Sequence, residues 1–120
     1  MNSHLRASIA YIAARLISAS TVTGVFDQSQ LRRVFLSGTV DRAVISAYDH
    51  ERNCFITGAG DGTHYSLFHQ GEGLHISLDI QEGAFWGHDY GRSTRFDGTV
   101  EGNAVTFHEC ELDRRFRYLL

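Results

Sequence analysis

The chain has 120 residues, and 42% of them are hydrophobic, which is enough for one globular domain with one core. A net charge of −3 and a pI near 6.1 argue against general binding to nucleic acid or to acidic membranes. Lysine is absent, which excludes Schiff-base chemistry and pyridoxal phosphate linkage. No cofactor is predicted.

Residues 4–17 are predicted to form an amphipathic helix. Its large apolar residues recur at helical spacing and are Leu5, Ile9, Ile12 and Leu16. A secretory signal peptide is the alternative, because small residues follow at Ser18, Ala19 and Ser20. Arg15 interrupts the apolar stretch, and no apolar run approaches the roughly 20 residues that span a bilayer. The helix therefore indicates a cytoplasmic protein without a membrane anchor.

From residue 44 to the C-terminus the sequence repeats every twenty residues. One column of the repeat holds Tyr48, Phe68, His88 and His108, and another holds Ile56, Ile76, Phe96 and Phe116. Each unit contains two strand-like segments of about seven residues, separated by turns rich in Gly, Asn and Asp. Such short connections permit only antiparallel neighbours. Residues 21–41 resemble a fifth, degraded copy, which gives ten strands within residues 22–120.

These ten strands are predicted to form a mainly β, up-and-down antiparallel meander in a single domain, residues 1–120. An open sheet of this size leaves two edges unpaired, so we expect the meander to close into a barrel. In size and strand count it is similar to the fatty-acid-binding and lipocalin-type barrels. Their diagnostic motifs are not matched here, so the resemblance implies no function.

The constant period predicts a register if every turn has the same odd length. All even-numbered residues then share one face, and that face carries most of the large apolar side chains. We therefore expect the even face to be the core and the odd face to point outward. In this register Trp86 lies opposite Gly98, so its ring would cover a strand glycine.

Two polar groups of residues are candidate sites. The even face offers a lining for a small cavity that would hold an apolar ligand: Tyr48, His64, His88, Tyr90, His108 and Tyr118. The odd face brings His69, His75 and Asp89 together from adjacent strands, a ligand set that suits a divalent transition metal. The alternatives are a packed core for the first group and a solvated ladder of ion pairs for the second. Cys54 and Cys110 are predicted to stay reduced.

A third group of residues predicts self-association. Large apolar side chains gather at one end of the odd face, and these are Ile45, Tyr65, Leu67, Phe85, Val105 and Phe107. The helix offers a matching apolar stripe that includes Ile12 and Leu16. A patch of this size must be covered, either by the chain's own helix or by that of a second copy. The short connection at residues 18–21 permits both arrangements. Our hypothesis is a homodimer built from the helix and this patch.

No motif in the chain specifies a reaction. The leading interpretation is a non-enzymatic binding or assembly module that forms homo-oligomers and binds neither nucleic acid nor membranes. The alternatives are a carrier of a small apolar ligand inside the barrel, and a metal-dependent enzyme that uses His69, His75 and Asp89.

Overall fold

The computed structural model describes residues 1–18 and 21–120, which form one helix and ten strands. The elements are α1 (Ser3–Ser18), β1 (Gly24–Asp27), β2 (Arg32–Val40), β3 (Val44–Asp49), β4 (Cys54–Gly60), β5 (His64–His69), β6 (Leu74–Gln81), β7 (Ala84–Asp89), β8 (Thr94–Glu101), β9 (Ala104–Glu109) and β10 (Arg114–Leu119). The short connection at residues 18–21, which is predicted to permit either helix position, includes 19–20, and these two lie outside the described residues.

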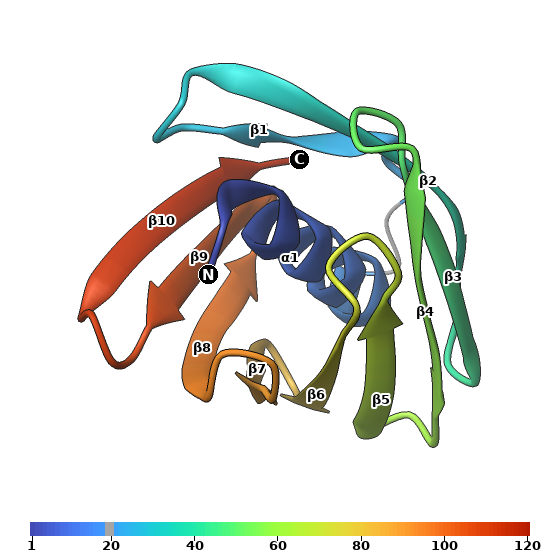
Figure 1. The fold of residues 1–120 in the computed structure, drawn as a ribbon. Helices are drawn as coiled ribbons and strands as arrows, with labels where there is room; N and C mark the ends of the chain where they lie inside the picture. The colour runs from blue at the N-terminus through green and yellow to red at the C-terminus, as the bar shows by residue number, and fades with distance from the viewer. Residues whose placement is uncertain (19–20) are drawn as a thin grey trace.

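The ten strands form a closed barrel in which each strand pairs with its neighbours in sequence (Figure 1). Every pairing is antiparallel, and β1 closes the barrel against β10 through Phe26 opposite Leu119 and Asp27 opposite Tyr118. This seam is short because β1 has only four residues. The predicted ten-stranded meander and its closure are thus confirmed.

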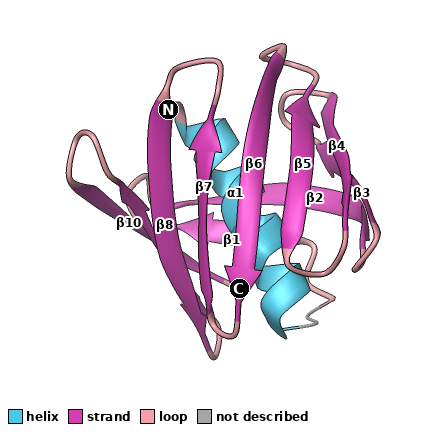
Figure 2. Cartoon of the chain, turned by 90° about the horizontal axis from the view of Figure 1, so that it is seen from below, coloured by secondary structure: helices cyan, strands magenta, loops and turns pink. Residues whose placement is uncertain are grey.

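Helix α1 lies inside the barrel, where strands surround it (Figures 1 and 2). All residues from Leu5 to Ala14 are buried, including Arg6 and Ser8, so the helix has no solvent-facing side over this stretch. Small residues such as Ala7 and Ala10 let it fit between the walls, while Ile9 and Ile12 fill the space beside them. Among the described residues, no helix has the length and apolar character that a bilayer crossing requires.

The observed register differs from the predicted one because the residues that point inward alternate between odd and even numbers from one strand to the next. Every hairpin connection leaves an even number of residues between its last paired positions, as in Asp49 opposite Cys54 and Gln81 opposite Ala84. An even loop places odd positions of one strand opposite even positions of the next. The core therefore takes even residues from β2, β4, β6, β8 and β10 and odd residues from the others. The prediction of one even-numbered core face is wrong for β1, β3, β5, β7 and β9.

The ring that covers Gly98 belongs to Phe85, not to Trp86 as the predicted register implied. Phe85 lies opposite Gly98 and is buried, whereas Trp86 points outward and is 41% exposed. A Cβ at Gly98 would lie 2.4 Å from Cζ of Phe85 and 2.1 Å from the carbonyl oxygen of Thr106. Only glycine permits this close approach, and Phe85 uses the space to pack 6.4 Å from the ring of Phe96 and 6.0 Å from that of Phe107.

The last residue of alternate strands, from β1 to β7, is polar and caps the turn that follows. Asp49 Oδ1 accepts hydrogen bonds from the backbone N–H groups of Glu51 and Arg52 at 2.9 and 3.2 Å. Asp27 and Asp89 make the equivalent bonds, and His69 Nδ1 accepts one from the Glu72 N–H group at 3.0 Å. Because the side chains at these positions point into the barrel, each capping residue is also a buried polar group.

The buried imidazole of His69 should make the fold sensitive to mild acid. Burial lowers the pKa of His69 below its ordinary value of 6.5, so the unfolded chain binds the proton more readily than the folded one. This contribution to stability is intact above about pH 6.5 and is lost as the pH falls toward the folded pKa. We expect His69→Asn, which keeps an acceptor for the turn, to unfold at a urea midpoint that changes less between neutral pH and about pH 5. An equal loss in both proteins would contradict this assignment.

Candidate binding surface

The predicted metal ligands lie on different faces of the barrel wall. His69 and Asp89 are 1% and 0% exposed and point inward, whereas His75 is exposed on the outer surface. The reason is the even turn length, which places His75 opposite Phe68 rather than beside His69. The prediction that these three side chains converge is therefore wrong.

The residues predicted to line an interior cavity are also mostly on the outside. Tyr118 alone of the six is buried in the barrel, where burial raises the pKa of its hydroxyl to about 12. The other five lie at outward positions: Tyr48, His64, His88, Tyr90 and His108. The prediction of a shared lining is wrong because α1 occupies the interior and because the face alternates from strand to strand.

The predicted association patch faces inward as well. All of its strand residues are at most 4% exposed: Ile45, Tyr65, Leu67, Phe85, Val105 and Phe107. Ile12 is fully buried and Leu16 is partly buried, because the chain's own helix covers this surface from inside the barrel. The need for a covering helix was predicted correctly, but the position of the patch on an exposed face was wrong. It offers no open surface for a second copy.

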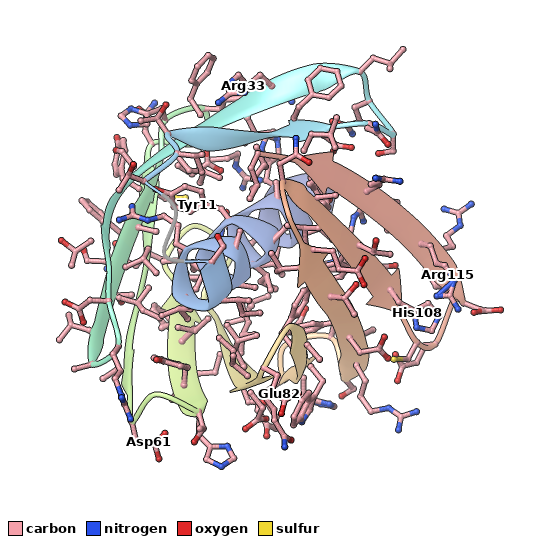
Figure 3. The ribbon with its side chains drawn as sticks, turned by 180° about the vertical axis from the view of Figure 1, so that it is seen from behind. Tyr11, Arg33, Asp61, Glu82, His108 and Arg115 are labelled. Atoms are coloured by element: carbon pink, nitrogen blue, oxygen red, sulfur yellow. The ribbon has the colours of Figure 1, made fainter. Side chains whose placement is uncertain are left out.

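What the register does assemble outside is a row of polar and aromatic side chains across six neighbouring strands. Direct cross-strand partners follow one another from β5 to β10: His64, Asp79, Trp86, Asp97, His108 and Arg115. We call these six residues the outer row. It places the chain's single tryptophan between two carboxylates, each of which has a histidine on its far side. Figure 3 shows His108 and Arg115 next to each other on the outside of the barrel.

A depression of 310 Å³ opens beside Trp86. Its lining includes His64, Asp79, Gln81 and Trp86. His64 Nδ1 is paired with a carboxylate oxygen of Asp79, whose side chain is only 22% exposed. The depression therefore has an indole, which is 41% exposed, next to a largely buried carboxylate that an imidazole holds in place. Cross-strand neighbours on the same face are within reach of one another's side chains, so a single group can contact both.

The other half of the outer row is organised around His108. Its Nε2 lies 2.9 Å from Asp113 Oδ1, and its Nδ1 lies 3.4 Å from Asp97. The hydrogen bond to Asp113 raises the pKa of His108 above its ordinary value, and Asp97 adds to the shift. The Cys110 thiol donates to Asp97 at 3.3 Å, and burial raises its pKa, so it stays protonated and is a poor nucleophile at neutral pH.

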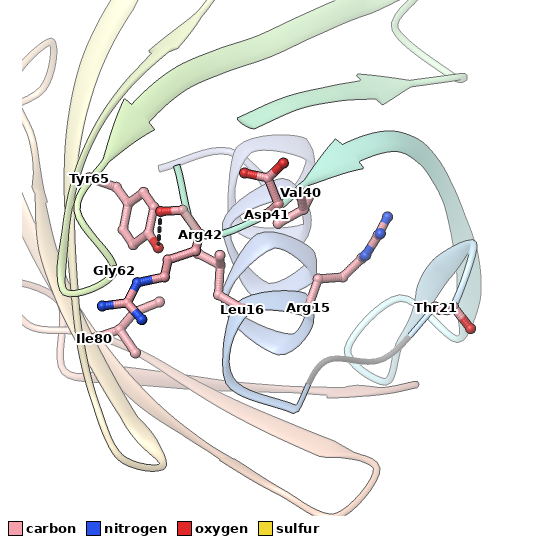
Figure 4. A pocket seen from close by; sticks show the side chains of 9 residues that line it. All are labelled: Arg15, Leu16, Thr21, Val40, Asp41, Arg42, Gly62, Tyr65 and Ile80. Atoms are coloured by element: carbon pink, nitrogen blue, oxygen red, sulfur yellow. Dashed lines mark hydrogen bonds between the residues drawn. The ribbon is translucent and has the colours of Figure 1, made fainter. Parts of the chain in front are cut away.

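A larger pocket, of 510 Å³, opens at the end of the barrel where α1 finishes (Figure 4). Two arginines line it, but their guanidinium groups point apart. Arg15 donates hydrogen bonds to the Tyr11 hydroxyl at 2.8 Å and to the Gly38 carbonyl at 3.1 Å, while Arg42 extends over Gly62. The pocket therefore has volume but no converging charges that would select an anion.

Sequence reasoning missed the outer row because it assigned Trp86 to the core. A usable signal was present, since an aspartate lies seven residues before Trp86 and another eleven residues after it, in strands that must flank it. Only the turn lengths decide whether these three residues share a face. No family model matches the chain, and no curated protein or solved structure is significantly similar to it.

Proposed function

We propose that this chain is a non-enzymatic binding module that holds a cationic side chain of a partner polypeptide, lysine or arginine, against Trp86. The observation that carries the proposal is the alternation of Asp79, Trp86 and Asp97 on three adjacent strands. An indole face attracts a cation through its quadrupole, by about 0.5–2 kcal/mol, and tryptophan is the best aromatic residue for this contact. The two carboxylates supply the complementary charge.

The surroundings of Trp86 favour a cation over an anion or an apolar ligand. Glu82 and Glu101 are exposed in or beside the turns next to the indole, so the local charge is negative. Arg95, the basic residue on the neighbouring strand, is engaged by Glu111 through a contact of 3.1 Å. A purely apolar ligand would desolvate the Asp79 carboxylate and add no partner to the one that His64 provides, which is costly.

A second copy of the chain is one source of such a group. Lysine is absent, so every permanently cationic side chain is an arginine, and Figure 3 shows Arg33 on the opposite side of the barrel from Glu82. Contact between these two sides would be heterologous, so it would build a ring or an open chain of copies rather than a two-fold dimer. This supports a role in assembly and uses exposed side chains, unlike the inward-facing patch.

Binding is measured with a tetra-arginine peptide by isothermal titration calorimetry. We expect Trp86→Ala to weaken binding about tenfold, because a desolvated cation–π contact is equivalent to roughly 1.4 kcal/mol. The control is Phe55→Ala, which removes an outward aromatic residue of similar exposure, 40%, and should leave the affinity unchanged. Asp79→Asn and Asp97→Asn should weaken binding and reduce its dependence on salt.

Three outcomes of this experiment would contradict the proposal. Equal affinity for tetra-glutamate and tetra-arginine would show that charge is not recognised. Salt-independent binding of a neutral oligosaccharide to wild type but not to Trp86→Ala would assign the surface to sugars. An unchanged affinity in Trp86→Ala would place the contact elsewhere. Light scattering at increasing protein concentration shows whether the cation comes from a second copy.

A further inference from the structure

The buried caps at the strand ends leave three carboxylate oxygens without a hydrogen bond. Within the described part of the chain, Oδ2 of Asp27, Asp49 and Asp89 has no hydrogen-bond partner and is buried. Their Oδ1 atoms are satisfied by the turns, so each side chain is held rigidly with one free oxygen directed away from the cap. A buried carboxylate oxygen without a partner is costly, and each such group requires a physical account.

Asp49 differs from the other two because further ligand atoms face its free oxygen. His4 Nδ1 lies 3.8 Å from Asp49 Oδ2 and 3.8 Å from Glu51 Oε2, and all three atoms lie within 4.8 Å of one another. His4 Nδ1 is itself buried and has no hydrogen-bond partner among the described residues. At 3.8 Å neither contact is a hydrogen bond. Two orphaned buried atoms thus face each other across a gap.

We propose that His4, Asp49 and Glu51 form a site for a divalent transition-metal ion of the Zn²⁺ type. One imidazole nitrogen and two carboxylate oxygens are ordinary zinc ligands, with bonds of about 2.0–2.2 Å. Two ligand atoms at a tetrahedral angle around zinc are therefore roughly 3.4 Å apart. The two separations of 3.8 Å from His4 Nδ1 are close to this value, and the two carboxylate oxygens, which lie within 4.8 Å of each other, move inward to meet the ion.

The neighbouring contacts already orient two of the three ligands. The Glu51 and Arg52 N–H groups fix Asp49 through its other oxygen, and Arg32 holds Oε1 of Glu51, which leaves Oε2 for the ion. Partners that orient a ligand in this way normally strengthen metal sites. Three protein ligands leave a fourth position for water. Since His4 lies on α1, Asp49 ends β3 and Glu51 lies in the turn after it, the ion would join the inner helix to the barrel wall.

The test uses untagged protein and measures its thermal midpoint with and without ZnCl₂. At a hundredfold excess of zinc over Kd we expect the midpoint of the wild type to rise by roughly 5–10 °C. His4→Asn and Asp49→Asn should lose this rise. Asp89→Asn is the matched control, because Asp89 caps its turn with the same distances of 2.9 and 3.2 Å but belongs to no such ligand group among residues 1–18 and 21–120, and it should keep the rise.

Stoichiometry and spectroscopy separate this site from the rest of the molecule, including Trp86. Titration calorimetry should give one zinc ion per chain, with binding at least tenfold weaker in His4→Asn. Three results would overturn the proposal. They are an equal midpoint rise in every variant, no binding at all, and a thiolate charge-transfer band with Co²⁺ that Cys110→Ser removes. The last would assign the metal to Asp97, His108 and Cys110, whose ligand atoms also lie within 4.8 Å of one another.

Discussion

Replacing Ile12 with glutamate should abolish the folded state. Ile12 is fully buried in the middle of α1, which lies inside the barrel (Figure 1). An unpaired buried carboxylate costs several kcal/mol, and the volume it must enter is already filled. A domain of this size has a total stability of roughly 5–15 kcal/mol, so the loss consumes most or all of it. Circular dichroism during urea denaturation should show no cooperative transition for Ile12→Glu.

A matched change on the outer surface separates burial from the chemistry of the substitution. Val44 is 51% exposed on β3, and Val44→Glu should change the free energy of unfolding by less than about 0.5 kcal/mol. Ile12→Val, which removes one methylene group from the same position, should cost about 0.5–1.5 kcal/mol. A folded Ile12→Glu protein with the wild-type midpoint would mean that α1 does not lie inside the barrel.

Removing the guanidinium group of Arg6 should be the second severe change. Arg6 is 8% exposed, and its Nη1 lies 3.2 Å from Oε1 of Glu109, which is 4% exposed. The same guanidinium group lies 3.7 Å from the ring centroid of Phe116. Arg6→Leu leaves the buried Glu109 carboxylate with one remaining partner, the N-terminal amino group of Met1 at 3.5 Å, so we expect a loss of up to about 3–5 kcal/mol in the free energy of unfolding.

The double variant Arg6→Leu with Glu109→Leu distinguishes a coupled pair from two independent contacts. Removing both charges avoids a buried carboxylate that has lost its guanidinium partner, so the double variant should be more stable than Arg6→Leu alone. Urea denaturation of the wild type, both single variants and the double variant gives the coupling energy. Additive losses would show that the ion pair does not link the helix to β9.

The buried polar residues are explained by two opposing requirements: the turn needs a hydrogen-bond acceptor, whereas the inward-facing position favours an apolar side chain. The strands β1, β3, β5 and β7 each end in a side chain that caps the four-residue turn that follows, and the strand direction places it inside the barrel. The end of α1 that carries His4 and Arg6 faces these groups. Helix N-termini favour negative charge, so the helix direction in the barrel agrees with the position of the carboxylates.

The sequence alone determined the strand number, their antiparallel order, the closure and the presence of one helix. These follow from local properties: a twenty-residue period, turn residues such as Gly102 and Asn103, and apolar spacing in residues 4–17. It also predicted correctly that Cys54 and Cys110 carry no disulfide bond. Each of these features depends on residues that are close together in the chain.

Only the tertiary structure decided which face of each strand points inward and where the helix lies. A single residue in the length of a turn reverses the face of the next strand, and turn composition does not distinguish three residues from four. This reversal moved Trp86 to the surface and His69 into the barrel. Closure then created an interior wider than the inward side chains fill, and α1 is the one segment whose apolar residues fit it. The face of each strand and the closure of the barrel around α1 together decide which residues form the candidate sites. No local pattern in the sequence encodes either feature.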